Sequence, residues 1–349
     1  MGTTTDKLNK LLTTKSEIKQ AIIDKGVSDV GDVFSEYPTY ISKIETGGAS
    51  NNIEYSMTYG EGTTNIQNVG VSFKNDDGTC LYYFQWHNQN LKTFEFTKAN
   101  LTKQPTTIQR MFTLCIRLTS VKGLDVFDLS KVTDTQNVFY GCNVLTNVAL
   151  PSLPSVTNAS QMFYQCSVLT NVDISSMINL QNASQMFYQC SALTNVNIPT
   201  AKVTSISEMF YTCRYLGDCN FKALNTSKVA DFTNVFAGCW YSTSFDLSSW
   251  STKSATNFKD MFLNNKNMSH LIFGSEWGTN TKSLVLDLST VATDVSYTLD
   301  DDTFNSMLTM YDRASNGLDK MTIKFSSKHN IPDGFIDKMT ARGYTITLV

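Results

Sequence analysis

Apolar residues recur along this chain in blocks of about 25 residues. The stretch from Asn158 to Val172, NASQMFYQCSVLTNV, returns from Asn182 to Val196 with one residue changed. A phenylalanine marks each block, at spacings of 27, 24, 24, 23, 26 and 26 residues: Phe112, Phe139, Phe163, Phe187, Phe210, Phe236 and Phe262. Self-similarity of this kind predicts seven repeat units, each of which must bury its apolar face, including this phenylalanine, against its neighbours.

The first half of each unit has the spacing of a short amphipathic helix. In the third unit, Ala159, Met162, Phe163 and Cys166 would share one helical face. Five residues before each phenylalanine stands a residue whose side-chain oxygen can cap a helix start: Thr107, Asp134, Asn158, Asn182, Ser205, Asp231 and Asn257. We therefore expect a short helix at the start of each unit.

The second half of each unit alternates as a strand does. The positions nine and eleven residues after the phenylalanine are apolar, as at Val172 and Ile174 in the third unit. Stacked units would align these strands in parallel at a spacing of about 4.8 Å. The pattern predicts an α/β repeat fold, a solenoid with one short helix and one short parallel strand per unit.

The motif MFxxCxxL, followed by a strand such as LTNVDIS, resembles the BspA-type leucine-rich repeats over about residues 90–275. The resemblance departs where Ser242 replaces the leucine and Asn265 replaces the cysteine. It implies a leucine-rich-repeat solenoid that binds partners along an extended face. It implies no enzymatic chemistry, so we expect no catalytic residues, no metal site and no cofactor.

The sequence outside the repeats divides into further segments. Residues 1–46 hold two amphipathic stretches that are too small to form a core, so we expect a helical adaptor that docks or oligomerises. Its apolar residues are Leu8, Leu11, Leu12, Ile18, Ile22, Phe34, Tyr37, Ile41 and Ile44. Residues 47–52 indicate a flexible joint, residues 53–100 a strand-rich N-terminal cap, residues 101–275 the seven units, and residues 276–349 a last repeat and an α/β C-terminal cap.

The stretch KLNKLLTTKSEIKQAIIDKGV, followed by FSEYPTYISKI, resembles an N-terminal segment of tail-fibre, baseplate and other virion proteins of bacteriophages, notably those of gut Bacteroidetes and Firmicutes. The resemblance implies docking on other virion proteins and a homo-oligomer, with a trimer favoured. We therefore expect a virion protein, released by lysis, whose repeats bind a host cell-surface protein or glycan. Two alternatives stay open: an architectural virion protein, such as a head fibre or tail-hub decoration, and a bacterial BspA-like surface adhesin.

Charge and hydropathy limit the classes of partner. The 28 basic and 31 acidic residues are scattered, which is not the footprint of a nucleic-acid-binding surface. The sequence shows no secretory signal peptide and no apolar stretch of membrane-spanning length. We expect neither a nucleic-acid partner nor membrane insertion.

Two surface columns are candidates for binding. Directly after the phenylalanine stand Tyr140, Tyr164, Tyr188 and Tyr211, predicted to form an outward row that binds glycan or protein. Alternatively, these rings stack on one another or meet a sister subunit. On the strand side, Asn147, Asn171, Asp173, Asn195 and Asn197 either satisfy backbone groups or line a ligand site.

The cysteines and acidic residues have structural interpretations. Six of the eight cysteines share one repeat position and Cys219 holds a strand position, which indicates buried thiols rather than disulfides or a zinc site. Cys80 lies outside this pattern. His87, His270 and His329 are isolated in the sequence. Asp300, Asp301 and Asp302 precede a predicted long helix; we expect Asp301 or Asp302 to cap it, rather than a cation site.

Overall fold

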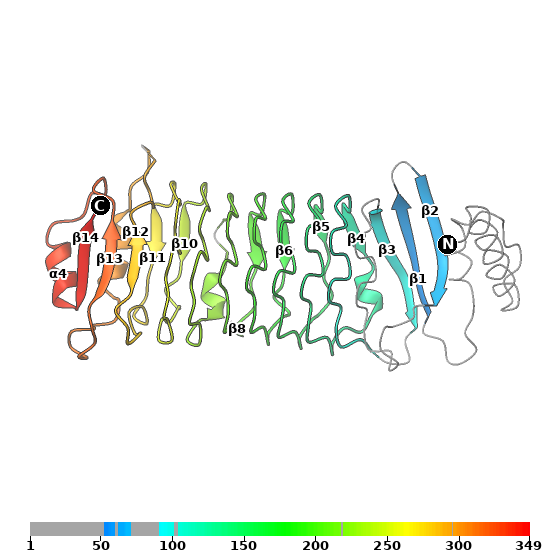
Figure 1. Cartoon of the computed structure of the whole chain (residues 1–349), viewed down its shortest axis with the longest axis horizontal. Helices are drawn as coiled ribbons and strands as arrows, with labels where there is room; N and C mark the ends of the chain where they lie inside the picture. The colour runs from blue at the N-terminus through cyan, green and yellow to red at the C-terminus, as the bar shows by residue number, and fades with distance from the viewer. Residues whose placement is uncertain (1–51, 60–61, 71–90, 101–103, 218, 295) are drawn as a thin grey trace, which may run out of the picture.

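The computed structural model describes residues 52–349 apart from residues 60–61, 71–90, 101–103, 218 and 295. The described residues form a long stack of coils whose strands lie side by side along the molecule (Figure 1). The stack runs from β2 (Gly62–Gly70) near one end to β14 (Tyr344–Leu348) at the other. The predicted leucine-rich-repeat solenoid is confirmed.

Antiparallel strands precede the repeats. β1 (Asn52–Tyr59) pairs with β2 on one side and with β3 (Leu91–Asn100) on the other, both antiparallel. β3 then pairs in parallel with β4 (Ser120–Lys122), and β4 with β5 (Asn147–Val148). One five-stranded sheet, in the order β2-β1-β3-β4-β5, therefore joins this end to the solenoid. A capping role for residues 53–100 stays a prediction.

Short parallel strands follow. β6 (Asn171–Asp173), β7 (Asn195–Asn197), β10 (Ser244–Asp246) and β11 (His270–Ile272) lie at the predicted places. β8 (Ala201–Lys202) and β9 (Leu224–Asn225) do not, because each begins 14 residues after its repeat phenylalanine. Val172 pairs with Val196, and Phe245 with Leu271. Two 3-10 helices, η2 (Leu124–Val126) and η3 (Phe221–Ala223), occupy longer connections. The parallel strand of the repeat is therefore confirmed where these strands form.

The short helix predicted at the start of each unit is wrong. In the third unit Gln161 and Gln165 have φ angles of 56° and 59°, in the left-handed region. The equivalent two positions are left-handed in all seven units, with Gly141 and Gly238 among them. A right-handed helix cannot continue through a left-handed residue every four positions. The segment is instead a run of consecutive turns.

Hydrogen bonds between coils replace the helical ones. The amides of Ala159, Gln161, Phe163 and Gln165 donate to carbonyls of the next coil over 2.7–3.0 Å. The amides in between close tight turns within the same coil, as from Met162 to the carbonyl of Ala159. The predicted cap residues also act here, because the Asn158 side chain accepts from the amide of Ser160 over 3.2 Å. Every amide from 159 to 166 is thus paired.

The core is a ladder of identical side chains. The seven repeat phenylalanines are all fully buried. Their rings stack in sequence, with centroids 5.5–5.8 Å apart. The turns described above make this possible, because they return each phenylalanine to the same place in every coil. Each ring therefore has an aromatic neighbour in the adjoining coil.

The six cysteines at the shared repeat position form a second inner column, as predicted, whereas Cys219 is buried but does not lie in the strand predicted for it. Cys115, Cys142, Cys166, Cys190, Cys213, Cys219 and Cys239 are buried as thiols. The Cys190 Sγ donates to the carbonyl oxygen of Phe163 over 3.0 Å, and four other units repeat this bond. Burial raises the pKa of the Cys190 and Cys166 thiols well above the usual value. Cys80 lies outside the described residues.

We expect these thiols to resist alkylation until the solenoid unfolds. In a Cys80→Ser variant at pH 8, iodoacetamide should label less than about one thiol per chain within an hour, because only an exposed thiolate reacts. Adding denaturant should expose seven. Mass spectrometry counts the labels. Labelling of Cys166 or Cys190 at the rate of free cysteine in the native protein would contradict the buried column.

The C-terminal end is an α/β unit. β12 (Val285–Leu288), β13 (Met321–Phe325) and β14 form a three-stranded parallel sheet. Helix α3 (Asp301–Met307) lies between β12 and β13 in the sequence, and helix α4 (Phe335–Ala341) lies between β13 and β14. α3 is shorter than predicted, and its cap is Asp300, not Asp301 or Asp302. Among the described residues, no helix is long and apolar enough to cross a membrane.

Candidate binding surface

The tyrosine row lies on the outside of the solenoid, at half-exposed positions. Tyr140, Tyr164, Tyr188 and Tyr211 stack with centroids 4.6–4.7 Å apart and planes within 12° of parallel. Each tyrosine follows a buried phenylalanine and precedes a residue with left-handed backbone, so the turn points its ring outward. The rings cover one another's faces, as in the alternative interpretation, and present their edges to solvent.

Amide side chains form a ladder on either side of the tyrosine row. Gln161 donates to Gln185 over 2.5 Å, and Gln185 donates to the Glu208 carboxylate over 2.5 Å. On the other side, Gln165 donates to Gln189 over 2.8 Å. These side chains satisfy one another along the solenoid, so the row is a regular surface before any partner arrives.

The hydroxyl groups of Tyr164 and Tyr188, in the middle of the row, stay protonated at neutral pH. Burial, followed by the neighbouring Tyr164 and Tyr211, raises the pKa of Tyr188 to about 12. Burial also raises the pKa of Tyr164. A neutral phenol both donates and accepts hydrogen bonds. The row therefore offers polar tips at a constant spacing, and its role in binding stays a prediction.

The strand side carries the predicted asparagine column. A shallow groove of about 550 Å³ crosses β5, β6 and β7. Its lining includes all five predicted residues: Asn147, Asn171, Asp173, Asn195 and Asn197. Asn147, Asn171 and Asn195 are exposed, and Asn171 lies opposite Asn195 in the parallel register of β6 and β7. A partner on this side would meet a polar surface of amides.

A third surface escaped the sequence analysis. The turn that follows the repeat cysteine carries Arg214 and Tyr215 in the fifth unit and Trp240 and Tyr241 in the sixth; we call these four residues the turn cluster. Tyr215, Trp240 and Tyr241 are 53%, 37% and 52% exposed. The signal was present in the aligned repeats, because units three and four have Ser-Val and Ser-Ala at these positions. Aligning the units for outward as well as inward positions would have found it.

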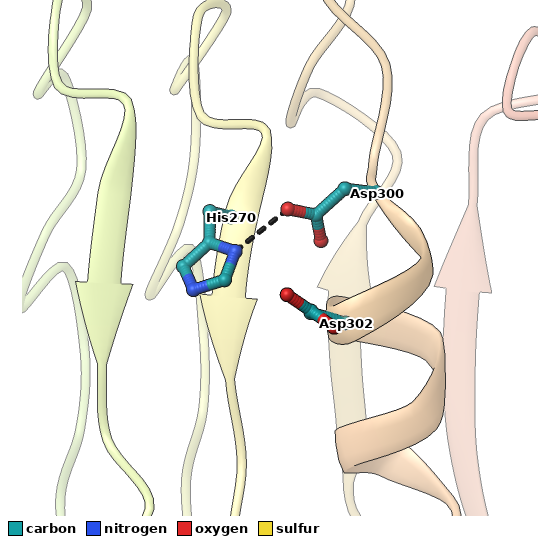
Figure 2. A group of neighbouring side chains, drawn as sticks. All are labelled: His270, Asp300 and Asp302. Carbon is teal, nitrogen blue, oxygen red and sulfur yellow. Dashed lines mark hydrogen bonds and ion pairs between the residues drawn. The ribbon is translucent and has the colours of Figure 1, made fainter.

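His270 is not isolated in the fold. Figure 2 shows its ring on β11 facing Asp300 and Asp302 at the start of α3. The Nδ1 of His270 lies 2.6 Å from Oδ2 of Asp300, and ligand-type atoms of the three residues lie within 4.8 Å of one another. The other oxygen of Asp300 accepts from the amide and hydroxyl of Thr303 over 2.8 and 2.7 Å. These bonds are those of a helix cap, and we interpret the group as structural.

The Asp300 cap should be lost in acid. Burial alone would raise the pKa of Asp300, but the hydrogen bonds from Thr303 and His270 outweigh it and hold the pKa below the usual 3.8. Asp300→Ala should cost about 1 kcal/mol of unfolding free energy at pH 7. That difference should vanish as the pH falls through the lowered pKa, because protonation then removes the charged acceptor.

Urea unfolding at pH 7 and at pH 2.5 measures the effect of Asp300→Ala, with Asp302→Ala as the control. Asp302 is exposed and belongs to the same helical turn. A cost for Asp300→Ala that persists unchanged at pH 2.5 would mean that the charged cap is not its source. An equal cost for Asp302→Ala would point to the charge of the turn rather than to the cap.

The predicted docking residues of the N-terminal segment lie outside the described residues. They are Leu8, Leu11, Leu12, Ile18, Ile22, Phe34, Tyr37, Ile41 and Ile44. The predicted adaptor over residues 1–46 and the joint over residues 47–52 therefore stay predictions from the sequence.

Two protein-family models match the chain. The BspA type leucine-rich repeat region matches residues 79–217 in six copies. The family described as a Mycoplasma protein of unknown function, DUF285, matches residues 181–296. No curated protein matches the chain. The match to the BspA-type repeats agrees with the resemblance that the repeat motif indicated, and the DUF285 match overlaps it over residues 181–217.

Proposed function

We propose that this protein is a binding protein whose solenoid holds a macromolecular partner along one extended face. The observation that carries the proposal is the tyrosine row with its amide ladders, which repeats one outward pattern over four consecutive coils. Weak contacts at each coil add up when a partner spans several coils. The BspA-type repeat region supports the same proposal.

A second, more specific proposal concerns the kind of particle or cell that carries this binding protein. The N-terminal segment's resemblance to phage tail proteins favours a virion fibre that binds a host cell-surface protein or glycan. The matched regions, residues 79–217 and 181–296, do not include that segment. The matched repeat region itself supports the alternative of a bacterial BspA-like surface adhesin. An architectural virion protein would use the same face for other virion proteins.

Binding of the labelled full-length chain to bacterial cells, animal epithelial cells and purified phage particles, followed by flow cytometry or co-sedimentation, tests the proposal. Tyr164→Ala with Tyr188→Ala should lower binding at least tenfold. The matched variant on the strand face is Asn171→Ala with Asn195→Ala, in the same two units. If both double variants bind like the parent chain, neither extended face holds the partner and the proposal is wrong.

The N-terminal segment has its own test. Deleting residues 1–46 should convert a homo-oligomer, expected to be a trimer, into a monomer. Analytical ultracentrifugation of the two chains measures this. A full-length chain that is already monomeric would contradict the predicted oligomerisation, while leaving binding by the solenoid face intact.

A further inference from the structure

The turn cluster is not required by the fold. In the third unit the same turn is built by Ser167 and Val168, and the amide of Ser167 closes it on Gln165 over 2.9 Å. In the sixth unit the amide of Tyr241 bonds the carbonyl of Arg214 in the preceding coil over 2.8 Å. Backbone bonds thus hold both turns, whichever side chains they carry. The exposed rings of the sixth unit therefore need another explanation.

Each ring of the sixth unit has one face already covered. The guanidinium of Arg214 lies over the Trp240 ring, 4.7 Å from its centroid. The Tyr215 ring stacks on Tyr241 with centroids 4.7 Å apart and planes 15° from parallel. Both partners come from the preceding coil. The opposite faces of Trp240 and Tyr241 are turned toward the following coil.

The following coil has no aromatic residue to continue either stack. Lys266 and Asn267 occupy the two equivalent positions. The two rings there line a cavity of about 290 Å³. The remaining lining residues are Asn264, Lys266, Asn267 and Asp294. The end of the aromatic stack thus opens onto a small pocket with polar walls.

The chemistry of the pocket is mixed and balanced. Two aromatic rings supply flat apolar area, which binds the apolar face of a ring-shaped ligand. Two amides, one ammonium group and one carboxylate supply both donors and acceptors around it. The charges of Lys266 and Asp294 offset one another, so the pocket favours a ligand with no net charge. Its volume lies near the lower end of ligand pockets, which are roughly 300 Å³ or larger.

We propose that the turn cluster and its cavity bind a neutral saccharide, with one pyranose ring packed on the uncovered faces of Trp240 and Tyr241. A pyranose has an apolar C–H face and a rim of hydroxyl groups, and each hydroxyl both donates and accepts. Asp294 accepts from such hydroxyls, Lys266 donates to them, and Asn264 and Asn267 do both. An apolar peptide would cover the charged groups of Lys266 and Asp294 without offering them polar contacts, which costs free energy.

The inference rests on the proposed function and names one class of partner for it. The test uses the full-length chain on a printed array of neutral and acidic glycans of bacterial and animal origin, with titration of any neutral hit by isothermal calorimetry. The key variant is Trp240→Ser with Tyr241→Val, which installs the turn residues of the third unit and so keeps a turn that the solenoid already builds. The control is Val168→Ala, at the equivalent turn of that unit.

We expect binding of at least one neutral glycan, an at least tenfold weaker affinity in the double variant, and an unchanged affinity in the control. The saccharide site would be overturned if no neutral glycan bound or if only acidic glycans bound. It would also be overturned if the double variant bound the neutral glycan with undiminished affinity. The cell-binding assay on the same samples separates the two proposals. Cell binding that survives Trp240→Ser with Tyr241→Val, without any glycan hit, would leave the proposed function standing and remove this inference.

Discussion

Replacing Arg313 by alanine should destabilise the C-terminal end of the solenoid by about 3 to 5 kcal/mol. Its side chain is fully buried, and its guanidinium donates to the carbonyls of Gly278, Asn280, Lys282 and Asp319. The two bonds from Nη1, to Gly278 and Asn280, are buried and measure 2.6 and 2.7 Å. All five guanidinium N–H groups are engaged. Without them, buried carbonyls lose their donors.

The Arg313 bonds join segments that are distant in sequence. Gly278 to Lys282 lead into β12, and Asp319 leads into β13. Burial lowers the pKa of Arg313, but a guanidinium still carries its proton at neutral pH. The carbonyl dipoles therefore surround a real charge. We expect its loss to loosen both connections at once, since a single group bonds them.

Hydrogen exchange of peptides from residues 276–349, together with thermal unfolding, measures the loss. Arg313→Met fills much of the same volume without donors, so it separates hydrogen bonding from packing. Arg313→Lys keeps the charge but offers three donors on one atom and cannot reach both loops as a planar fork. We expect stability to fall from the parent chain through Arg313→Lys to Arg313→Met. A Met variant as stable as the parent would show that the bonds contribute nothing net.

The repeat and its strands were predictable because one position carries the same residue in every unit. Phe112 to Phe262 set the phase, and Val172 or Val196 mark the strand in that phase. Stacking identical units puts identical side chains together, so the core ladder follows from the period alone. The buried cysteines follow for the same reason.

The helix was wrongly predicted because its signals also fit another structure. Apolar residues at Ala159, Met162, Phe163 and Cys166 face inward in a helix, and they also face inward in turns with left-handed residues between them. A side chain that caps a helix also caps a turn. Glycine at 141 and 238 was the local hint. The hydrogen bonds that favour turns over a helix reach into the next coil, about 24 residues away. The helix propensity of a single unit cannot predict them.

Departures from the repeat were the least predictable features. Arg313 stands in YDRASNG, which has the composition of a solvated loop, and its burial depends on loops that are remote in sequence. His270 likewise meets Asp300 across two elements, β11 and α3. In contrast, the outward position of the tyrosine row was predictable from the inward position of the preceding phenylalanine. The structural roles of residues at regular repeat positions could therefore be predicted, while those of residues that end or interrupt the repeat could not.

Replacing Phe187 by alanine should cost about 3 to 5 kcal/mol of unfolding free energy. The ring is fully buried and stacks between Phe163 and Phe210, with centroids 5.5 Å away on both sides. Removing it leaves a gap in the middle of the ladder that neighbouring coils cannot close, because backbone bonds hold them at a constant spacing. Since units contact only their neighbours, we also expect the two halves of the solenoid to unfold less cooperatively.

Tyr188→Ala is the matched control for Phe187→Ala, one residue along the chain. Its ring stacks at 4.6 and 4.7 Å between Tyr164 and Tyr211, but on the outer side and half-exposed. Its loss removes stacking without opening an internal cavity, so we expect a cost of about 1 kcal/mol. Urea unfolding followed by tryptophan fluorescence and by circular dichroism measures both variants, and separated midpoints from the two probes would report the lost cooperativity. Equal costs for Tyr188→Ala and Phe187→Ala would mean that stacking along the solenoid, and not burial in its core, holds the coils together.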